Sequence, residues 1–202
     1  MTESLVHVVD DDESVRDAVS MLLDSVDVAH EVYSSGDDFL EKYDPAQGGC
    51  LVLDIRMPGM SGLELQDRLL EKDCSIPIVF ITGHGDIPMA VEAMRKGAVD
   101  FIRKPFRDQE LLDRIHEALH QDMDVRARDE QRGEMLKSIE SLTPRETEVF
   151  ERVCEGQANK VIAIELGISE RTVEIHRSQV MHKTGSRSLA ELVRLKLALE
   201  DG

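Results

Sequence analysis

The stretch Leu51-Val52-Leu53-Asp54-Ile55-Arg56-Met57-Pro58-Gly59 decides the fold that we expect. A short apolar run delivers the carboxylate of Asp54, and Met57-Pro58-Gly59 then breaks the chain into a loop. Such a run is typical of a buried parallel strand with a polar group at its carboxyl end. Taken alone, Asp54 also fits a solvated acid at a strand end. Because ligands of open α/β sheets bind at that edge, Asp54 is the first candidate functional residue.

Four more apolar runs alternate with helical patterns over residues 1–120. The predicted strands cover 5–9, 29–33, 51–54, 77–83 and 98–102, and the predicted helices cover 13–26, 37–43, 61–70, 86–96 and 109–119. A capping box at Ser61 and Glu64 begins the third helix, whose Leu65, Leu69 and Leu70 are expected inside. Strict alternation of strands and helices predicts an α/β fold with a doubly wound, five-stranded parallel sheet.

Polar side chains follow the other strands as well. Asp10 and Asp11 end the first strand, Thr82 ends the fourth, and Lys104 follows the fifth. Together with Asp54 they predict a phosphoryl-transfer site, in which Asp54 is a nucleophile that forms an aspartyl phosphate. Thr82 and Lys104 would contact the phosphoryl group. Each residue alone also has an ordinary structural explanation as a cap, a surface threonine or a snorkelling lysine.

The acids at this edge predict a site for Mg²⁺ or another divalent cation such as Mn²⁺. Magnesium takes few protein carboxylates and keeps its waters. Asp11, Asp54 and one backbone carbonyl, that of Arg56, suffice, with Asp10 acting through water. The cation would offset charge on the phosphoryl oxygens.

Charge separates the chain into parts with different partners. The net charge is −17, of which residues 1–120 carry −14, residues 121–140 carry −2 and residues 141–202 carry −1. The first part repels nucleic acid, and the last is balanced enough to present a basic face. No apolar run is long enough for a membrane span and no signal peptide opens the chain, so we expect a cytoplasmic protein. Cys50, Cys74 and Cys154 lack metal spacing and are expected to be buried thiols, with a redox sensor as the less favoured alternative.

Residues 121–140 are predicted to form a charged, solvated helical linker, with Gly133 as a candidate break. Residues 141–202 then predict a separate all-α domain of four helices. Thr143, Pro144 and Glu146 begin the first, and Val161, Ile162 and Leu166 are expected inside the second. A turn at Gly167 leads to a third helix capped by Ser169, which completes a helix-turn-helix. Its outer face is cationic and rich in hydroxyl groups, which favours docking in the major groove of DNA over a merely solvated face.

Residues 1–120 resemble the receiver domain of two-component response regulators, which has a flavodoxin-like fold. The resemblance rests on Asp10-Asp11, Asp54, Met57-Pro58-Gly59, Thr82 and Lys104-Pro105, and residues 81–94 resemble the FixJ subfamily. It implies phosphorylation by a sensor histidine kinase, a Lys-Pro bond that is typically cis, and a switch in which Thr82 and Phe101 move. It also implies a homodimer when phosphorylated, with a dimer face at Val91, Arg95, Phe101 and Arg103. Arg56 and His84 are expected to tune hydrolysis of the acyl phosphate.

Residues 141–202 resemble the LuxR-type effector domain. The matching segments are Leu142–Glu146, Asn159–Ala163 and Ser169–His176. By this resemblance Glu174, Ile175 and Ser178 reach base edges, where Glu174 accepts from cytosine and Ile175 packs on a thymine methyl. The remaining predicted DNA-binding residues, most of which would hold phosphates, are Lys160, Arg171, Thr172, His176, Arg177 and Lys183. Several relatives carry lysine in place of Glu174, which leaves the base preference open.

The resulting prediction is a two-component response regulator with a receiver at 1–120, a linker at 121–140 and a DNA-binding domain at 141–202. It is phosphorylated on Asp54, dimerises, binds double-stranded DNA and regulates transcription as an activator, with RNA polymerase as a further candidate partner. It is not expected to be an enzyme beyond assisting its own phosphotransfer and slow autodephosphorylation; aspartyl-phosphate phosphatases need an acid where this chain has Arg56. One alternative is a DNA- or protein-binding regulator that is controlled mainly by partner binding rather than by phosphorylation. Another is an interaction module, in which the third helix of the C-terminal domain binds protein or RNA.

Overall fold

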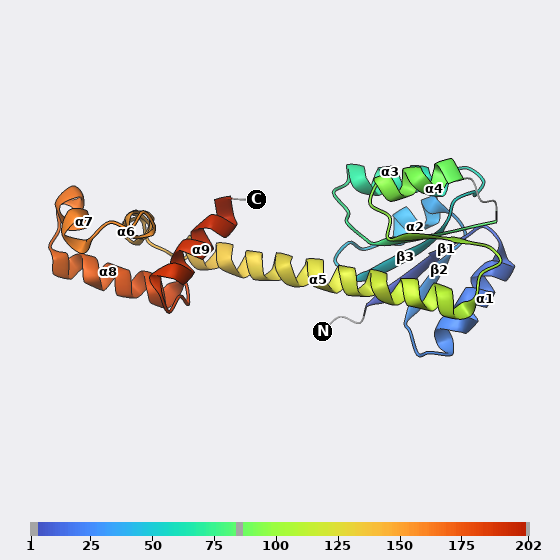
Figure 1. Ribbon diagram of the computed structural model, residues 1–202, viewed down its shortest axis with the longest axis horizontal. Coiled ribbons are helices and arrows are strands. Elements are labelled where there is room, and N and C mark those ends of the chain that lie inside the picture. Colours follow the sequence, from blue (N-terminus) through green and yellow to red (C-terminus); the bar gives the residue numbers. More distant parts are fainter. Residues whose placement is uncertain (1–3, 84–86, 201–202) are drawn as a thin grey trace. The chain divides into compact units, whose positions relative to one another are not determined.

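The computed structural model describes residues 4–83 and 87–200, which form two compact units with a boundary between Arg126 and Ala127. The strands and helices of the first unit alternate, as the sequence predicts (Figure 1). The strands are β1 (Leu5–Val9), β2 (His30–Tyr33), β3 (Gly49–Asp54), β4 (Ile78–Thr82) and β5 (Asp100–Arg103). The helices are α1 (Glu13–Asp24), α2 (Gly36–Lys42), α3 (Gly62–Glu71), α4 (Ile87–Arg95) and α5 (Asp108–Glu140).

The five strands form one parallel sheet in the order β2-β1-β3-β4-β5. Helices α2, α3 and α4 lie on one face, and α1 and the first part of α5 lie on the other (Figure 1). Because the sheet is covered on both faces, β3 is buried at all six positions, and it ends in Asp54. The predicted doubly wound α/β fold is confirmed.

Alternating side chains of the strands supply a separate apolar core to each face of the sheet. Leu51 and Leu53 pack with Phe39 and Leu65 on the α2–α4 face, and Val52 packs with the opposite cluster. The capping box at Ser61 and Glu64 begins α3 as predicted. The expectation for Leu70 is wrong, because it is 48% exposed while Leu65 and Leu69 fill the inner face of the helix. Of the three thiols only Cys50 is buried, and Cys74 and Cys154 are half-buried.

Helix α5 is continuous from Asp108 to Glu140, so the candidate break at Gly133 is not present. A glycine inside a helix costs only about 1 kcal/mol relative to alanine, which a helix of this length tolerates. Its first part buries Leu111, Leu112 and Ile115 against the sheet. The charged stretch predicted to be a linker is therefore helical throughout.

The second unit contains α6 (Pro144–Cys154), α7 (Asn159–Leu166), α8 (Glu170–Lys183) and α9 (Leu189–Glu200), together with the end of α5. Helix α6 begins with the predicted capping box of Thr143 and Glu146. Ser169 caps α8, and its hydroxyl accepts the N–H of Thr172. Gly167 ends α7 in the left-handed conformation with φ +65°, which forms the tight turn of the helix-turn-helix. The predicted four-helix domain is confirmed.

The core of this unit gathers one face of each helix. Val173 and Val180 of α8 are buried as predicted, and they pack with Val149 and Ile162. The inward placement of Val161 is wrong, because that side chain is 44% exposed and its neighbours Ile162 and Ala163 face the core instead. Across the described parts of both units, no helix has the length and hydropathy needed to cross a bilayer.

Candidate phosphoryl-acceptor site and DNA-binding face

The strand ends bring Asp10, Asp54 and Lys104 into direct contact, although 94 residues separate Lys104 from Asp10. The Lys104 Nζ donates to Asp10 Oδ2 at 2.5 Å and to Asp54 Oδ1 at 2.7 Å. Asp10 ends up beside β3 because β1 pairs with β3 in parallel register, and Lys104 follows directly after β5. The bond between Lys104 and Pro105 is cis. Two carboxylates therefore converge on one cation at the carboxyl edge of the sheet.

The site is largely withdrawn from water, which changes the acidity of its groups. Asp10 is 1% exposed and Asp54 is 5% exposed. Burial raises the pKa of Asp54, although its hydrogen bond to Lys104 acts in the opposite direction. Burial also opposes the charge on Lys104, but its hydrogen bonds to Asp10 and Asp54 outweigh that effect and raise its pKa. An ammonium held in this way stays charged and is available to an anion bound at Asp54.

The backbone around Asp54 fixes the second carboxylate oxygen. The N–H of Arg56 donates to Asp54 Oδ2 at 2.6 Å. Gly62, at the start of α3, passes so close that a Cβ there would lie 2.3 Å from the Asp54 carbonyl oxygen. Arg16 donates to the Asp10 carbonyl oxygen at 2.7 Å. Sequence reasoning missed Gly62 and Arg16; the position of Gly62 directly after the capping Ser61 is the signal that could have pointed to it.

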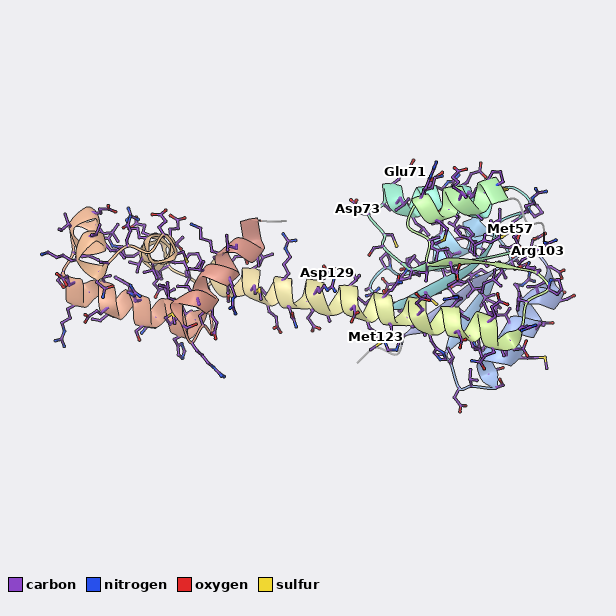
Figure 2. The ribbon with its side chains drawn as sticks, in the orientation of Figure 1. Met57, Glu71, Asp73, Arg103, Met123 and Asp129 are labelled. Atoms are coloured by element: carbon purple, nitrogen blue, oxygen red, sulfur yellow. The ribbon has the colours of Figure 1, made fainter. Side chains whose placement is uncertain are left out.

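The predicted switch residues lie on β4, which pairs with β3, and on β5, the edge strand beyond it. Thr82 is 1% exposed at the end of β4, in register with Arg103 of β5. Phe101 is half-buried and packs against the core on the α2–α4 face. Figure 2 shows Met57 and Arg103 at the same end of the sheet, opposite the end where Asp73 lies. His84 lies outside the described residues.

The donor chemistry of this edge fits a hard divalent cation. Within residues 4–83 and 87–200, no three or more His, Cys, Asp or Glu side chains are grouped as a metal site. Magnesium does not need such a group, because one or two carboxylates and several waters satisfy it. Asp10 and Asp54 supply two carboxylates that already share a cation, and Asp11 next to them is exposed.

The residues of the predicted dimer face lie on α4 and β5, which pack together. Val91 is 45% exposed, and Arg95 and Arg103 are also exposed. Met94 of α4 adds a further exposed apolar side chain at 43%. This surface therefore combines apolar and cationic groups, whereas Phe101 lies half-buried beneath it.

Helix α8 presents most of the predicted DNA-binding residues on one exposed face. Arg171, Glu174, Ile175 and Ser178 are exposed and follow the helical spacing of a single stripe. Ile175 is 54% exposed, so its apolar side chain is accessible within this largely polar stripe. Thr172 and His176 are half-buried beside this stripe, and Lys160 is exposed on α7.

Two predicted DNA-binding cations have partners inside the unit. Lys183 Nζ donates to Glu146 Oε2 at 2.6 Å and to the Ser141 carbonyl oxygen at 3.1 Å. Arg177 Nη1 donates to Asn159 Oδ1 at 2.9 Å, which joins α8 to the start of α7. Both side chains therefore stabilise the helix-turn-helix, a role that sequence reasoning did not assign to them.

Comparison with known families agrees with the geometry of both units. The response regulator receiver domain matches residues 6–116, and the bacterial regulatory proteins of the luxR family match residues 140–196. The chain belongs to the two-component response regulators, with a receiver domain and a LuxR-type DNA-binding domain.

Individual relatives place the chain in the FixJ subfamily. The transcriptional regulatory protein FixJ of Azorhizobium caulinodans is 44% identical over 98% of this chain and 94% of its own length. The response regulator protein TodT of Pseudomonas putida is 45% identical over 98% of this chain and 87% of its own length. Among solved structures, the response regulator StyR has 48% identity and a TM-score of 0.90 over 99% of this chain and 100% of its own. Full-length FixJ from B. japonicum has 39% identity and a TM-score of 0.59 over all of both chains.

Proposed function

We propose that a sensor histidine kinase phosphorylates Asp54, and that the phosphorylated chain forms a homodimer, binds double-stranded DNA and activates transcription. The observation that carries this proposal is the contact of Lys104 with both Asp54 and Asp10 in a buried site at the end of β3. The shared architecture of the relatives, a receiver followed by a DNA-binding domain, supports it.

Asp54 acts as the nucleophile. A carboxylate oxygen of Asp54 attacks the phosphorus of a phosphohistidine, the new O–P bond forms, and the P–N bond breaks with its electron pair going to the imidazole. Lys104 transfers its hydrogen bond from Asp54 to a phosphoryl oxygen, and the Thr82 hydroxyl donates to another. Asp10, Asp11, Asp54 and the carbonyl of Arg56 would hold Mg²⁺, which supplies charge neutralisation on the phosphoryl oxygens when bound. Arg56 and His84 would tune the slow loss of the phosphoryl group.

The output steps use two exposed surfaces. Val91, Arg95 and Arg103 form the dimer face on α4 and β5, and Phe101 beneath it changes position with Thr82. Glu174, Ile175 and Ser178 reach base edges in the major groove. The DNA phosphates are held by Lys160, Thr172, His176, Arg177 and Lys183, and Arg171 is a further DNA-binding residue. Lys183 and Arg177 contact phosphates while keeping their partners within the domain. RNA polymerase is the partner of the DNA-bound dimer, and the protein works in the cytoplasm.

The test is labelling of the purified chain with phosphoramidate in the presence of Mg²⁺. Mass spectrometry is expected to show a gain of one phosphoryl group in the wild type and none in Asp54→Asn. Asp12→Asn is the matched control, because Asp12 caps α1 and asparagine caps equally well. Labelling of Asp54→Asn would contradict the assignment of Asp54 as the phosphoryl acceptor. Duplex affinity is then measured for the labelled and the unlabelled chain, and equal affinities would favour control by partner binding.

A further inference from the structure

The guanidinium of Arg126 on α5 is bound by the loop that precedes β3. Its Nη2 donates to the carbonyl oxygens of Pro45 at 3.1 Å and Gln47 at 2.5 Å, and its Nη1 donates to that of Ala46 at 3.1 Å. Its Nε donates to both carboxylate oxygens of Asp122, at 2.9 and 3.0 Å. The three carbonyls belong to residues about 80 positions earlier in the chain, so this is a tertiary contact.

Asp122 continues the connection to the strand that carries the phospho-acceptor. Its side chain is buried, and Oδ2 accepts the backbone N–H of Gly49 at 2.8 Å. Gly49 is the first residue of β3, and Asp54 is the last. A buried carboxylate is stable only when it is paired and hydrogen-bonded, so Asp122 depends on Arg126 and Gly49 together.

Gly48 allows this close approach. A Cβ added to Gly48 would lie 2.9 Å from Asp122 Oδ2, closer than real Cβ atoms pack, and 3.1 Å from Arg126 Nε, tighter than most such contacts. We use the name output clasp for Asp122, Arg126 and the backbone of residues 45–49.

The helix beyond the output clasp has little support of its own. Residues 127–132 are all exposed, and five of the six are polar or charged. A short, solvated helical segment is marginal without a tertiary anchor, because its stability comes from packing rather than from propensity. The output clasp provides such an anchor just before this segment begins.

We propose that the output clasp holds α5 helical beyond the receiver and is required for phosphorylation of Asp54 to control DNA binding. This inference rests on the proposed function, since it concerns how the phosphorylated receiver acts on the DNA-binding domain. Without the output clasp, both domains keep their own activities and lose their coupling.

The experiment compares the full-length wild type with Arg126→Gln, and Arg128→Gln is the matched control on the exposed part of the same helix. Hydrogen exchange of residues 122–132 is measured by mass spectrometry. Duplex affinity is measured with and without phosphoramidate, using a duplex selected from a random pool by the phosphorylated wild type. We expect exchange to be about tenfold faster in Arg126→Gln and the ratio of the two affinities to fall towards one. Arg128→Gln should match the wild type in both.

Unchanged exchange, or an unchanged affinity ratio, in Arg126→Gln would overturn the proposal. If the wild type binds the duplex equally well with and without phosphoramidate, the proposed function is refuted and the coupling with it. If the wild type shows a difference in affinity and Arg126→Gln shows the same difference, only the role of the output clasp is refuted. If Arg126→Gln does not fold, Gly48→Ala replaces it, since the added methyl group displaces Asp122 and Arg126 by contact and carries the same expectations.

Discussion

Replacing Lys104 with methionine removes the ammonium that both buried carboxylates of the receiver contact. Methionine keeps the apolar stem, so the change isolates the charge. The side chains of Asp10, Asp54 and Lys104 are 1%, 7% and 19% exposed, so solvent screens this contact only weakly. Removing one partner of a buried ion pair costs about 3–5 kcal/mol, because an uncompensated charge remains.

This cost predicts a large fall in the melting temperature of the receiver without metal. For a unit of this size, 1 kcal/mol corresponds to about 3–5 °C, so we expect a decrease of roughly 10–25 °C. Added Mg²⁺ should restore about 3 kcal/mol at a concentration a hundredfold above its dissociation constant. It should stabilise the variant more than the wild type, because in the variant it no longer competes with an ammonium for the carboxylates.

Tyrosine fluorescence during thermal unfolding measures this effect in the receiver alone. The chain has no tryptophan and two tyrosines, Tyr33 and Tyr43, and both belong to the first unit. The control is Lys96→Met, which breaks ion pairs to the half-exposed Asp67 and Glu92 and should cost less than about 1 kcal/mol. A loss below 1 kcal/mol in Lys104→Met, or equal stabilisation of variant and wild type by Mg²⁺, would refute the reasoning.

Other perturbations probe separate parts of the chain. Burial lowers the pKa of His7 below its ordinary value of 6.5, although Glu31 acts in the opposite direction. As pH falls, His7 is therefore protonated in the unfolded chain before it is protonated in the folded chain, so the free energy of unfolding should decrease below pH 6.5. His7→Phe should flatten that part of a pH titration of unfolding. The hydrogen bond from Lys183 lowers the pKa of Glu146, so the pair should lose its contribution to stability as pH falls below about 4.5. A double-mutant cycle with Lys183→Met and Glu146→Gln, with unfolding followed by circular dichroism, should give a coupling energy of about 1–2 kcal/mol at pH 7. A coupling energy of zero would argue against the contact. Ile175→Ala should change the ranking of duplexes in a binding selection, whereas a uniform loss across sequences would remove Ile175 from base readout.

Local sequence signals predicted the element boundaries best. The capping boxes at Ser61 and Thr143 depend on residues three positions apart, so the sequence alone is enough to place them. The sequence predicts less well which apolar side chains of a helix face the core. Leu70 and Val161 have apolar side chains at plausible helical positions, but the tertiary packing selected their neighbours instead.

The candidate site was predictable because parallel strands put their carboxyl ends at one edge, which brings Asp10 and Lys104 together regardless of loop lengths. No comparable rule predicts the contact of Arg126 with the carbonyls of residues 45–47. In sequence, Asp122 and Arg126 are one of many i,i+4 charge pairs on a helix, and such pairs are usually solvated. Only the three-dimensional path of the loop before β3 distinguishes this pair from the others.

The charges at the carboxyl edge bear on the proposed phosphorylation of Asp54. Before modification, Lys104 neutralises one of two buried carboxylates, and burial holds the pKa of Asp54 above its ordinary value. A phosphoryl group adds further negative charge and new acceptor oxygens at a site where unpaired charge is costly. Lys104 and the Thr82 hydroxyl on the next strand are positioned to offset that charge. In the proposed switch, Phe101 moves with Thr82; it is half-buried on β5, where its register partner is Phe80, two residues before Thr82 on β4.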